Sequence, residues 1–430
     1  MSFRDDLHSQ DLEIPYSTNT AILSAPLVLW NKELPNRIGI LPLEGYDSEK
    51  DGSPSPHVYR RYLRFVEGGS GLIWFEACAV SEDGKSNPRQ MMLHDDNVNA
   101  FRDLIRAMDS KAASSGRDPS FKVLQLTHSG RLSMDANWNS IALSPKKLND
   151  RDTAILASDE RIAKMVQEHI HAAKLAADAG FDAVDIKVCH GYFLCELLSA
   201  FHREGRYGGS FENRTRAFFE IINGIREEVG DRIGISVRLN AFDSLPYPDG
   251  FGVIDEDGRK KPDLSETIRL CTLLRDHGVR LINISASAPR ERLFGPAPTD
   301  PKYLKYGTPC DYLMAVKLLK ENVPGVCFMC TGLSSFGEHG GFIGAGGISE
   351  QWFDIAGFGR QALAYPSFAN DLLTQGSMDA HKCSIDCGKC FRLMDSHSRV
   401  GCIIRDRDEF FPLYSQYVLG KEDGSTAENI

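Results

Sequence analysis

Short apolar runs recur along the chain and alternate with stretches whose apolar residues repeat at helical spacing. The runs are rich in Ile, Val, Leu and Phe, a composition typical of buried strands. The pattern predicts eight strands, at 37–43, 72–77, 122–127, 183–188, 233–239, 281–286, 326–331 and 354–360.

The stretches between these runs predict helices. One of them has five apolar residues at helical spacing: Ile162, Val166, Ile170, Ala173 and Ala177. Gly180 follows them at the position expected for a helix C-cap glycine. Further helices are expected at about 56–68, 97–115, 211–229, 264–277 and 310–322. The stretch 334–350 is glycine-rich, and only its end has a helical pattern. Strand followed by helix, eight times, predicts a TIM (β/α)8 barrel, with a doubly wound open sheet as the alternative fold.

Polar residues at the carboxyl ends of the strands are the candidates for function, because the active site of such a barrel forms there. In the fourth strand, Asp185 and Lys187 share one face by the two-residue period. They form either an ion pair inside the barrel or, for Lys187 at the catalytic end, part of the active site.

Composition and charge narrow the class of partner. The 430 residues are 42% hydrophobic and 25% charged, which describes an ordinary globular chain. With 49 Lys and Arg against 59 Asp and Glu, the net charge is −10, so no positive field exists to hold nucleic acid or anionic lipid. No run of eighteen apolar residues occurs and the start has no signal-peptide pattern, so we expect a cytoplasmic protein that binds a small molecule.

The chain is expected to divide into a barrel with its lead-in, residues 1–377, and a C-terminal extension, residues 378–430. A polar loop at 241–263 is longer than its connection needs and is either a lid or a passive excursion. Eleven cysteines without a signal peptide favour reduced thiols, metal binding or catalysis over disulfides. Four of them lie within twenty residues of the extension: Cys383, Cys387, Cys390 and Cys402.

Six ordered segments resemble the signature blocks of the Old Yellow Enzyme, or NADH:flavin oxidoreductase, family. They are LPNRIGILPLEG (34–45), LQLTHSGR (124–131), AGFDAVDIKVCHGYFLCELLSA (179–200), YGGSFENR (207–214), SVRL (236–239) and AGFGRQAL (356–363). The resemblance implies a TIM barrel that carries non-covalent FMN and transfers hydride between NAD(P)H and an electron-poor alkene or a related acceptor.

The resemblance also implies a flavin phosphate site at the last two strands. A phosphate dianion needs backbone N–H donors and a cation, and Gly332, Gly359 and Arg360 suit these roles. A side chain at either glycine would obstruct the approach of the backbone to phosphate.

Residues on the other strands match the positions that hold the flavin ring. Gln125 is expected to read the pyrimidine edge, and Arg238 to supply the cation where reduction places negative charge. Ala77 is expected to make a backbone contact. Pro42 and Glu44 lie on the first strand, where Glu44 replaces the Thr or Cys of relatives and would lower the flavin potential unless Lys187 pairs with it.

The catalytic segment departs from the family in one residue. His190 and Tyr192 match the family's second histidine and its proton-donating tyrosine, whereas Lys187 replaces the first histidine. A protonated lysine can stabilise a developing enolate as a point charge. It can equally pair with Asp185 or Glu44 and leave the acceptor oxygen to His190.

The four cysteines of the extension offer the ligand number of a [4Fe–4S] cluster or a zinc ion. Longer relatives that resemble bacterial dienoyl-CoA reductase and trimethylamine dehydrogenase carry such a cluster after the barrel, but with a different first spacing. Iron–sulfur, zinc and unligated thiols therefore remain three alternatives for Cys383, Cys387, Cys390 and Cys402.

We expect an FMN-dependent enzyme that reduces an activated C=C bond in a ping-pong cycle driven by NAD(P)H. One alternative is a dehydrogenase or demethylase that passes electrons through the cluster to a separate redox protein. Another is a flavin-free barrel lyase or binding protein with a zinc-bound tail. The family resemblance also suggests that the chain forms a homo-oligomer.

Overall fold

Eight parallel strands form the centre of the molecule in a computed structural model, which describes residues 2–134, 140–144, 154–286, 293–294 and 299–420. Each falls within a predicted run: β3 (Ile38–Ile40), β4 (Leu72–Ala79), β5 (Phe121–Thr127), β8 (Ala183–Val188), β9 (Gly234–Asn240), β12 (Leu281–Ser285), β13 (Cys327–Met329) and β14 (Ala356–Phe358), give or take one or two end residues. They neighbour one another in chain order, β14 pairs with β3, and a parallel bridge between Met329 and Ile355 closes the ring. The barrel prediction is confirmed, and the open sheet is wrong because the strand order never reverses.

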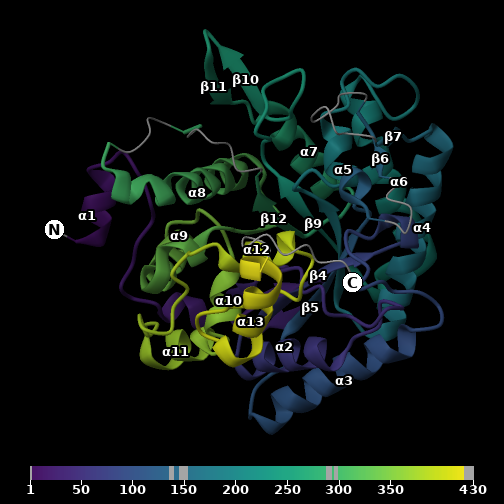
Figure 1. Cartoon of the computed structure of the whole chain (residues 1–430). Coiled ribbons are helices and arrows are strands. Elements are labelled where there is room, and N and C mark those ends of the chain that lie inside the picture. Colours follow the sequence, from purple (N-terminus) through teal and green to yellow (C-terminus); the bar gives the residue numbers. More distant parts are fainter. Residues whose placement is uncertain (1, 135–139, 145–153, 287–292, 295–298, 421–430) are drawn as a thin grey trace.

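Helices surround this barrel (Figure 1). They are α2 (Pro56–Glu67), α3 (Val98–Ser114), α4 (Asp159–Ala179), α5 (Phe193–Leu198), α6 (Phe211–Val229), α7 (Ser265–Asp276), α8 (Leu304–Asn322), α9 (Gly340–Ser349), α10 (Arg360–Ala364) and α11 (Phe368–Gln375). Local signals account for several ends. Ser158 caps α4 by accepting a hydrogen bond from Arg161 N, and Gly180 ends it in the left-handed conformation at φ 98°.

The glycine-rich stretch is more helical than its sequence pattern indicates, because α9 occupies Gly340–Ser349 in full. Its glycines serve close packing. A Cβ at Gly346 would lie 2.3 Å from Tyr16 N, and one at Gly347 would lie 2.1 Å from the Phe353 ring. The helix is therefore stabilised by neighbours that fit only against a surface without side chains, not by its own propensity.

The amino-terminal end of the barrel is closed by a hairpin of β1 (Leu27–Leu29) and β2 (Lys32–Leu34). Trp30 in its turn stacks on Phe121, with ring centroids 5.9 Å apart. Apolar side chains such as Trp74 and Leu281 fill the barrel beside it. Because this end of the barrel is filled, we expect the ligand site at the opposite, carboxyl end of the strands.

The remaining elements lie outside the barrel. A helix α1 (Phe3–His8) begins the chain, β6 (Ile141–Ala142) pairs with β7 (Ile155–Leu156), and β10 (Val253–Glu256) pairs with β11 (Arg259–Pro262). The β10–β11 hairpin lies in the loop predicted at 241–263 and projects from one side of the molecule (Figure 1). Within the described residues, no helix combines the length and the apolar character needed to cross a bilayer.

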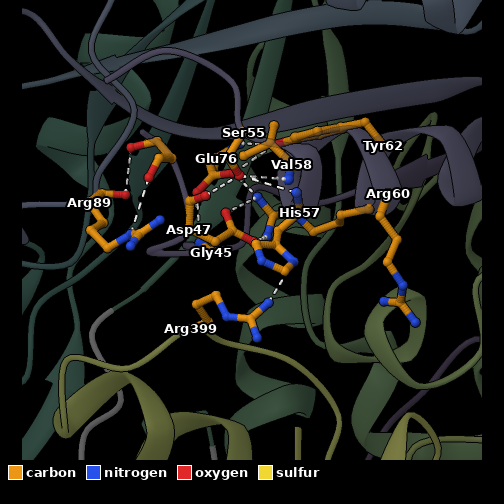
Figure 2. A network of polar contacts seen from close by, with 12 residues as sticks. Gly45, Asp47, Ser55, His57, Val58, Arg60, Tyr62, Glu76, Arg89 and Arg399 are labelled. Carbon is orange, nitrogen blue, oxygen red and sulfur yellow. Dashed lines mark hydrogen bonds and ion pairs between the residues drawn. The ribbon is translucent and has the colours of Figure 1, made fainter. Parts of the chain in front are cut away.

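The described part of the extension, residues 378–420, folds against α2. Its helices α12 (Lys389–Asp395) and α13 (Arg407–Tyr414) enclose a small core that includes Leu393 and Phe410. Asp406 accepts hydrogen bonds from Arg60 (2.8 and 2.9 Å) and Arg64 (2.7 Å) on α2. Arg399 reaches back to His57, as Figure 2 shows. These contacts fix the extension beside the barrel, and the division at residue 377 stays a prediction.

Candidate active site

A cavity of about 810 Å³ opens at the carboxyl ends of the barrel strands. Its volume lies within the range of small-molecule and cofactor sites. All eleven residues predicted to bind the cofactor or to act in catalysis line it: Pro42, Glu44, Ala77, Gln125, Lys187, His190, Tyr192, Arg238, Gly332, Gly359 and Arg360. None of residues 241–263 lines this cavity, so the structure gives the predicted lid no contact with it.

Asp185 organises the deepest part of the site. Its buried carboxylate accepts hydrogen bonds from Trp74 Nε1 (2.9 Å), Gln125 Nε2 (2.6 Å) and the Arg238 backbone N (2.5 Å). Burial raises the pKa of Asp185 to about 6, against the effect of these three donors. Because Gln125 gives its amide nitrogen to Asp185, its carbonyl oxygen is left as the acceptor at the cavity wall.

Arg238 lies beside Asp185, at the deepest part of the cavity. Its guanidinium donates to Pro42 O (3.3 Å), while the buried Nε has no hydrogen-bond partner in the structure. A buried cation with an unused donor suits a ligand that gains negative charge. Gln125 and Arg238 together therefore fit the predicted flavin ring.

Lys187 pairs with Glu44 and not with Asp185. The Lys187 Nζ lies 3.1 Å from Glu44 Oε1 and 3.4 Å from the centroid of the Tyr192 ring. Tyr192 Oη is also directed at Glu44 Oε1, at 3.5 Å. The alternative of an internal Asp185–Lys187 ion pair is wrong, because three other donors already surround the Asp185 carboxylate.

His190 and Tyr192 are both uncharged in the site. His190 has a left-handed backbone (φ 62°), and its Nε2 lies 2.9 Å from Ser285 Oγ. Burial lowers the pKa of His190 well below its ordinary value, helped by the charges of Arg238 and Lys187, so the imidazole is neutral. Burial and Glu44 raise the pKa of Tyr192 well above its ordinary value, so the phenol is protonated.

A second polar network supports the Glu44 segment from behind. Glu76 accepts a hydrogen bond from Gly45 N (2.7 Å), the residue next to Glu44. Arg61 bridges Glu76 and Asp47, and burial raises the pKa of Glu76. Figure 2 shows Asp47, Glu76 and Gly45 gathered beside α2. The backbone that carries Glu44 is thus anchored by buried charges, a support that no sequence motif indicates.

Arg360 lies at the other end of the cavity. It donates to Ser335 Oγ (3.2 Å) and forms an ion pair with Asp386 of the extension. The Gly359 N–H is used by Ser334 Oγ (3.0 Å). Gly332 is left-handed (φ 104°), and a Cβ there would lie 3.3 Å from Pro309 Cα. A Cβ at Gly359 would meet the protein only at ordinary contact distance, 3.6 Å from Leu43, so the room there is available to a ligand.

The extension forms a wall of the cavity that sequence reasoning missed. Asp386, Cys390, Phe391, Met394 and Val400 line it together with residues of the barrel. The ring of Phe391 lies 5.5 Å from the guanidinium carbon of Arg360. The only signal in the sequence is an acidic residue between two cysteines, which does not indicate a partner 26 positions away.

The four cysteines of the extension line one small cavity, and Cys390 lines both this cavity and the large one. Within the part of the chain that the structure describes, no three His, Cys, Asp or Glu residues are grouped closely enough to hold a metal ion. Cys383 Sγ accepts from Gln361 (3.2 Å) and Cys402 Sγ from Arg405 N (3.4 Å). The predicted ligand set is therefore near one place but not assembled around a metal, and a cluster stays a prediction.

Comparisons with known proteins agree with this geometry. A model of the NADH:flavin oxidoreductase / NADH oxidase family matches residues 23–285. An NADPH dehydrogenase of Bacillus pumilus (strain SAFR-032) is 32% identical over 276 residues, which cover 62% of this chain and 73% of that protein.

Two solved structures share the fold. An Old Yellow Enzyme homologue from Zymomonas mobilis superposes with a TM-score of 0.61 at 20% identity and covers 83% of this chain and 94% of that one. A 2-naphthoyl-CoA reductase in complex with 2-naphthoyl-CoA superposes with a TM-score of 0.73 at 20% identity over 90% of this chain. The match spans only 57% of that longer chain.

Proposed function

The chain belongs to the NADH:flavin oxidoreductase / NADH oxidase family, and from this premise we propose that it uses FMN and NAD(P)H to reduce an activated C=C bond of a small-molecule acceptor. Family membership makes the chain a flavin oxidoreductase and excludes the flavin-free lyase or binding protein. The observation that carries the proposal is the convergence of all eleven predicted residues on one cavity.

The donor set of the cavity suits FMN along its length. The Gln125 carbonyl can accept from the pyrimidine edge of the ring, and Arg238 can neutralise charge beside it. Arg360 and the Ser335 hydroxyl can hold the phosphate at the far end. Pro42, Glu44 and Ala77 also line this cavity, and Gly332 and Gly359 keep the phosphate end open. Bound FMN supplies the hydride, which it receives from NAD(P)H.

The residues beside the ring can hold and protonate the acceptor. The Lys187 ammonium, placed by Glu44 and the Tyr192 ring, donates to the electron-withdrawing oxygen. Neutral His190 has a single ring N–H, and it shares that task when Nε2 accepts from the Ser285 hydroxyl and Nδ1 carries the proton. Tyr192 Oη keeps its proton at neutral pH and can deliver it to the second carbon.

One observation favours the second candidate, a dehydrogenase that passes electrons out of the flavin. Cys390 lines both the large cavity and the cysteine-lined cavity, so a cluster bound by Cys383, Cys387, Cys390 and Cys402 would lie beside the flavin. A separate redox protein would then receive the electrons. Iron and acid-labile sulfide in stoichiometric amounts, with a broad brown absorption shoulder, would support this candidate.

The experiment that tests the proposal follows the flavin spectrum. The protein is purified after growth with riboflavin, reduced anaerobically with NADPH or NADH, and then mixed with cyclohex-2-enone. We expect flavin bands near their usual positions, bleaching by the nicotinamide, and their return with formation of cyclohexanone. A protein that carries and accepts no FMN, or whose reduced flavin no enone reoxidises, would overturn the proposal.

A further inference from the structure

The ion pair between Glu44 and Lys187 lies inside the cavity and is shielded from water. Their side chains are 12% and 3% exposed, and both line the cavity. The pair joins strands that are far apart in sequence, since Glu44 follows β3 and Lys187 belongs to β8. A buried pair is costly to desolvate unless its remaining hydrogen-bonding capacity is used.

The two oxygens of Glu44 are used unequally. Oε1 accepts from Lys187 Nζ (3.1 Å) and faces Tyr192 Oη (3.5 Å). Oε2 is shielded from solvent and has no hydrogen-bond partner in the structure. A buried acceptor without a donor is destabilising, and more so when it is charged. The site therefore gains from any ligand that brings a donor to this oxygen.

The neighbouring protein donors are already engaged. The backbone N–H of Gly45 goes to Glu76 (2.7 Å). The Arg61 guanidinium is held by Asp47 and Glu76. Glu44 lines the cavity, so a molecule bound there can bring the donor that these two groups do not supply.

The isoalloxazine ring of the flavin does not supply that donor in its oxidised form. An oxidised isoalloxazine has a single N–H group, at N3, and the Gln125 carbonyl is the acceptor proposed for it. Its remaining ring nitrogens and oxygens accept hydrogen bonds. The ribityl hydroxyls of FMN are donors as well, but the acceptor substrate is the molecule proposed to bind Lys187, which is in direct contact with Glu44, and we assign the donor for Oε2 to it.

We propose that Glu44 is a specificity-determining residue that selects acceptors with a hydroxyl or amine N–H on the carbon next to the carbonyl whose oxygen binds Lys187. The inference rests on the proposed function and narrows its substrate class. Because Lys187 Nζ and the Glu44 carboxylate are in direct contact, two substrate groups on adjacent carbons are close enough together to reach both. Such a substrate makes two charge-assisted hydrogen bonds at once, which a simple enone cannot do.

The test compares two enones of similar size that differ in the donor. We expect 6-hydroxycyclohex-2-enone to have a kcat/KM about 10-fold or more above that of 6-methoxycyclohex-2-enone, since hydrogen bonds to charged groups are among the stronger ones in proteins. The Glu44→Gln variant keeps the size of the side chain and loses the charge, so the preference should fall to about twofold or less. Glu49→Gln removes an exposed carboxylate from the same segment and should retain the preference.

Binding gives a second readout that needs no turnover. Titration of the oxidised holoprotein with 2-hydroxycyclohexanone or 2-methoxycyclohexanone, followed by the shift of the flavin bands, yields the ratio of their dissociation constants. We expect about 10-fold tighter binding of the hydroxyl compound by the wild type and near equality in Glu44→Gln. If this variant does not fold, equal binding of both ketones by the wild type alone still contradicts the inference.

The outcomes separate the two proposals. A wild-type protein that treats the hydroxy and methoxy compounds alike, or a hydroxyl preference that Glu44→Gln retains, overturns the role of Glu44. A reduced flavin that no enone reoxidises overturns the proposed C=C reduction instead, and the ketone titrations then decide the role of Glu44 by themselves.

Discussion

Removal of the Asp386 carboxylate should strengthen the binding of FMN. Asp386 forms an ion pair with Arg360, the cation proposed for the flavin phosphate, and both residues line the large cavity. The carboxylate and the phosphate therefore share one guanidinium. The Asp386→Asn variant keeps the shape of the side chain and removes the charge that repels the phosphate.

The size of the effect follows from the position of the pair. Two unit charges on opposite sides of one guanidinium lie roughly 6 Å apart and repel by about 3 kcal/mol at an effective dielectric constant near 20. The side chains of Arg360 and Asp386 are 25% and 16% exposed, so solvent screens part of this repulsion. About 1.4 kcal/mol should remain, which corresponds to about a tenfold lower dissociation constant for FMN in the variant.

Fluorescence titration of the apoprotein measures this directly. Riboflavin has the same ring without the phosphate, and its affinity should not differ between wild type and Asp386→Asn. Asp395→Asn, which removes an exposed carboxylate from the same extension, should leave both affinities unchanged. An unaltered or weaker affinity for FMN in Asp386→Asn, or equal strengthening for riboflavin, would refute the reasoning.

Three further predictions concern catalysis and stability. Tyr192→Phe should slow reoxidation of the flavin by an enone about 10²–10⁴-fold while leaving reduction by NADPH within about twofold; stopped-flow rates that fall equally in both halves would contradict the role of proton donor. Asp185→Asn should lower the free energy of unfolding in urea at pH 7 by about 2–4 kcal/mol, because an amide cannot accept from all three donors. Burial raises the pKa of Asp185 to about 6 in the folded chain. Between about pH 4 and 6 the folded chain therefore holds a proton on Asp185, whereas the unfolded chain has released it. The wild type should therefore gain about 1 kcal/mol relative to this variant from pH 7 to pH 5, and a constant difference would contradict that pKa. Asp406→Ala should lower the free energy of unfolding by about 1 kcal/mol at pH 7 and speed proteolysis of the extension, since hydrogen bonds from Arg60 and Arg64 outweigh partial burial and lower the pKa of Asp406. The ionised Asp406 carboxylate stabilises the fold above about pH 4 and loses this effect as it is protonated at lower pH. The free energies of unfolding of wild type and variant should therefore converge in acid.

The barrel could be predicted because each of its strands is signalled locally. A buried strand needs a short apolar run, and the sequence keeps eight such runs apart by helices with caps of their own, such as the one that ends at Gly180. The glycine-rich helix α9 could be predicted only in part. Its stability comes from Tyr16 and Phe353, which pack against its bare backbone and lie outside the helix itself.

The candidate site divides in the same way. Strand ends converge in any barrel, so residues such as Gln125 and Arg238 could be placed from their position on a strand alone. Partners could not. Lys187 had two carboxylates within plausible reach, and only the packing of Trp74 and Gln125 around Asp185 decides that it pairs with Glu44. The wall made by the extension has no local signal at all, because it depends on how residues after the barrel fold back across α2.

That wall also implies an order of assembly during translation. Asp386, Phe391 and Met394 follow every barrel strand in chain order, so a ribosome delivers the complete ring of strands before the segment that covers its Arg360 side. Until that segment docks, the cavity wall lacks the residues that the extension contributes to it. Docking of the later segment through Asp406 then completes the cavity wall beside Arg360, so the part of the chain that is made last finishes the site.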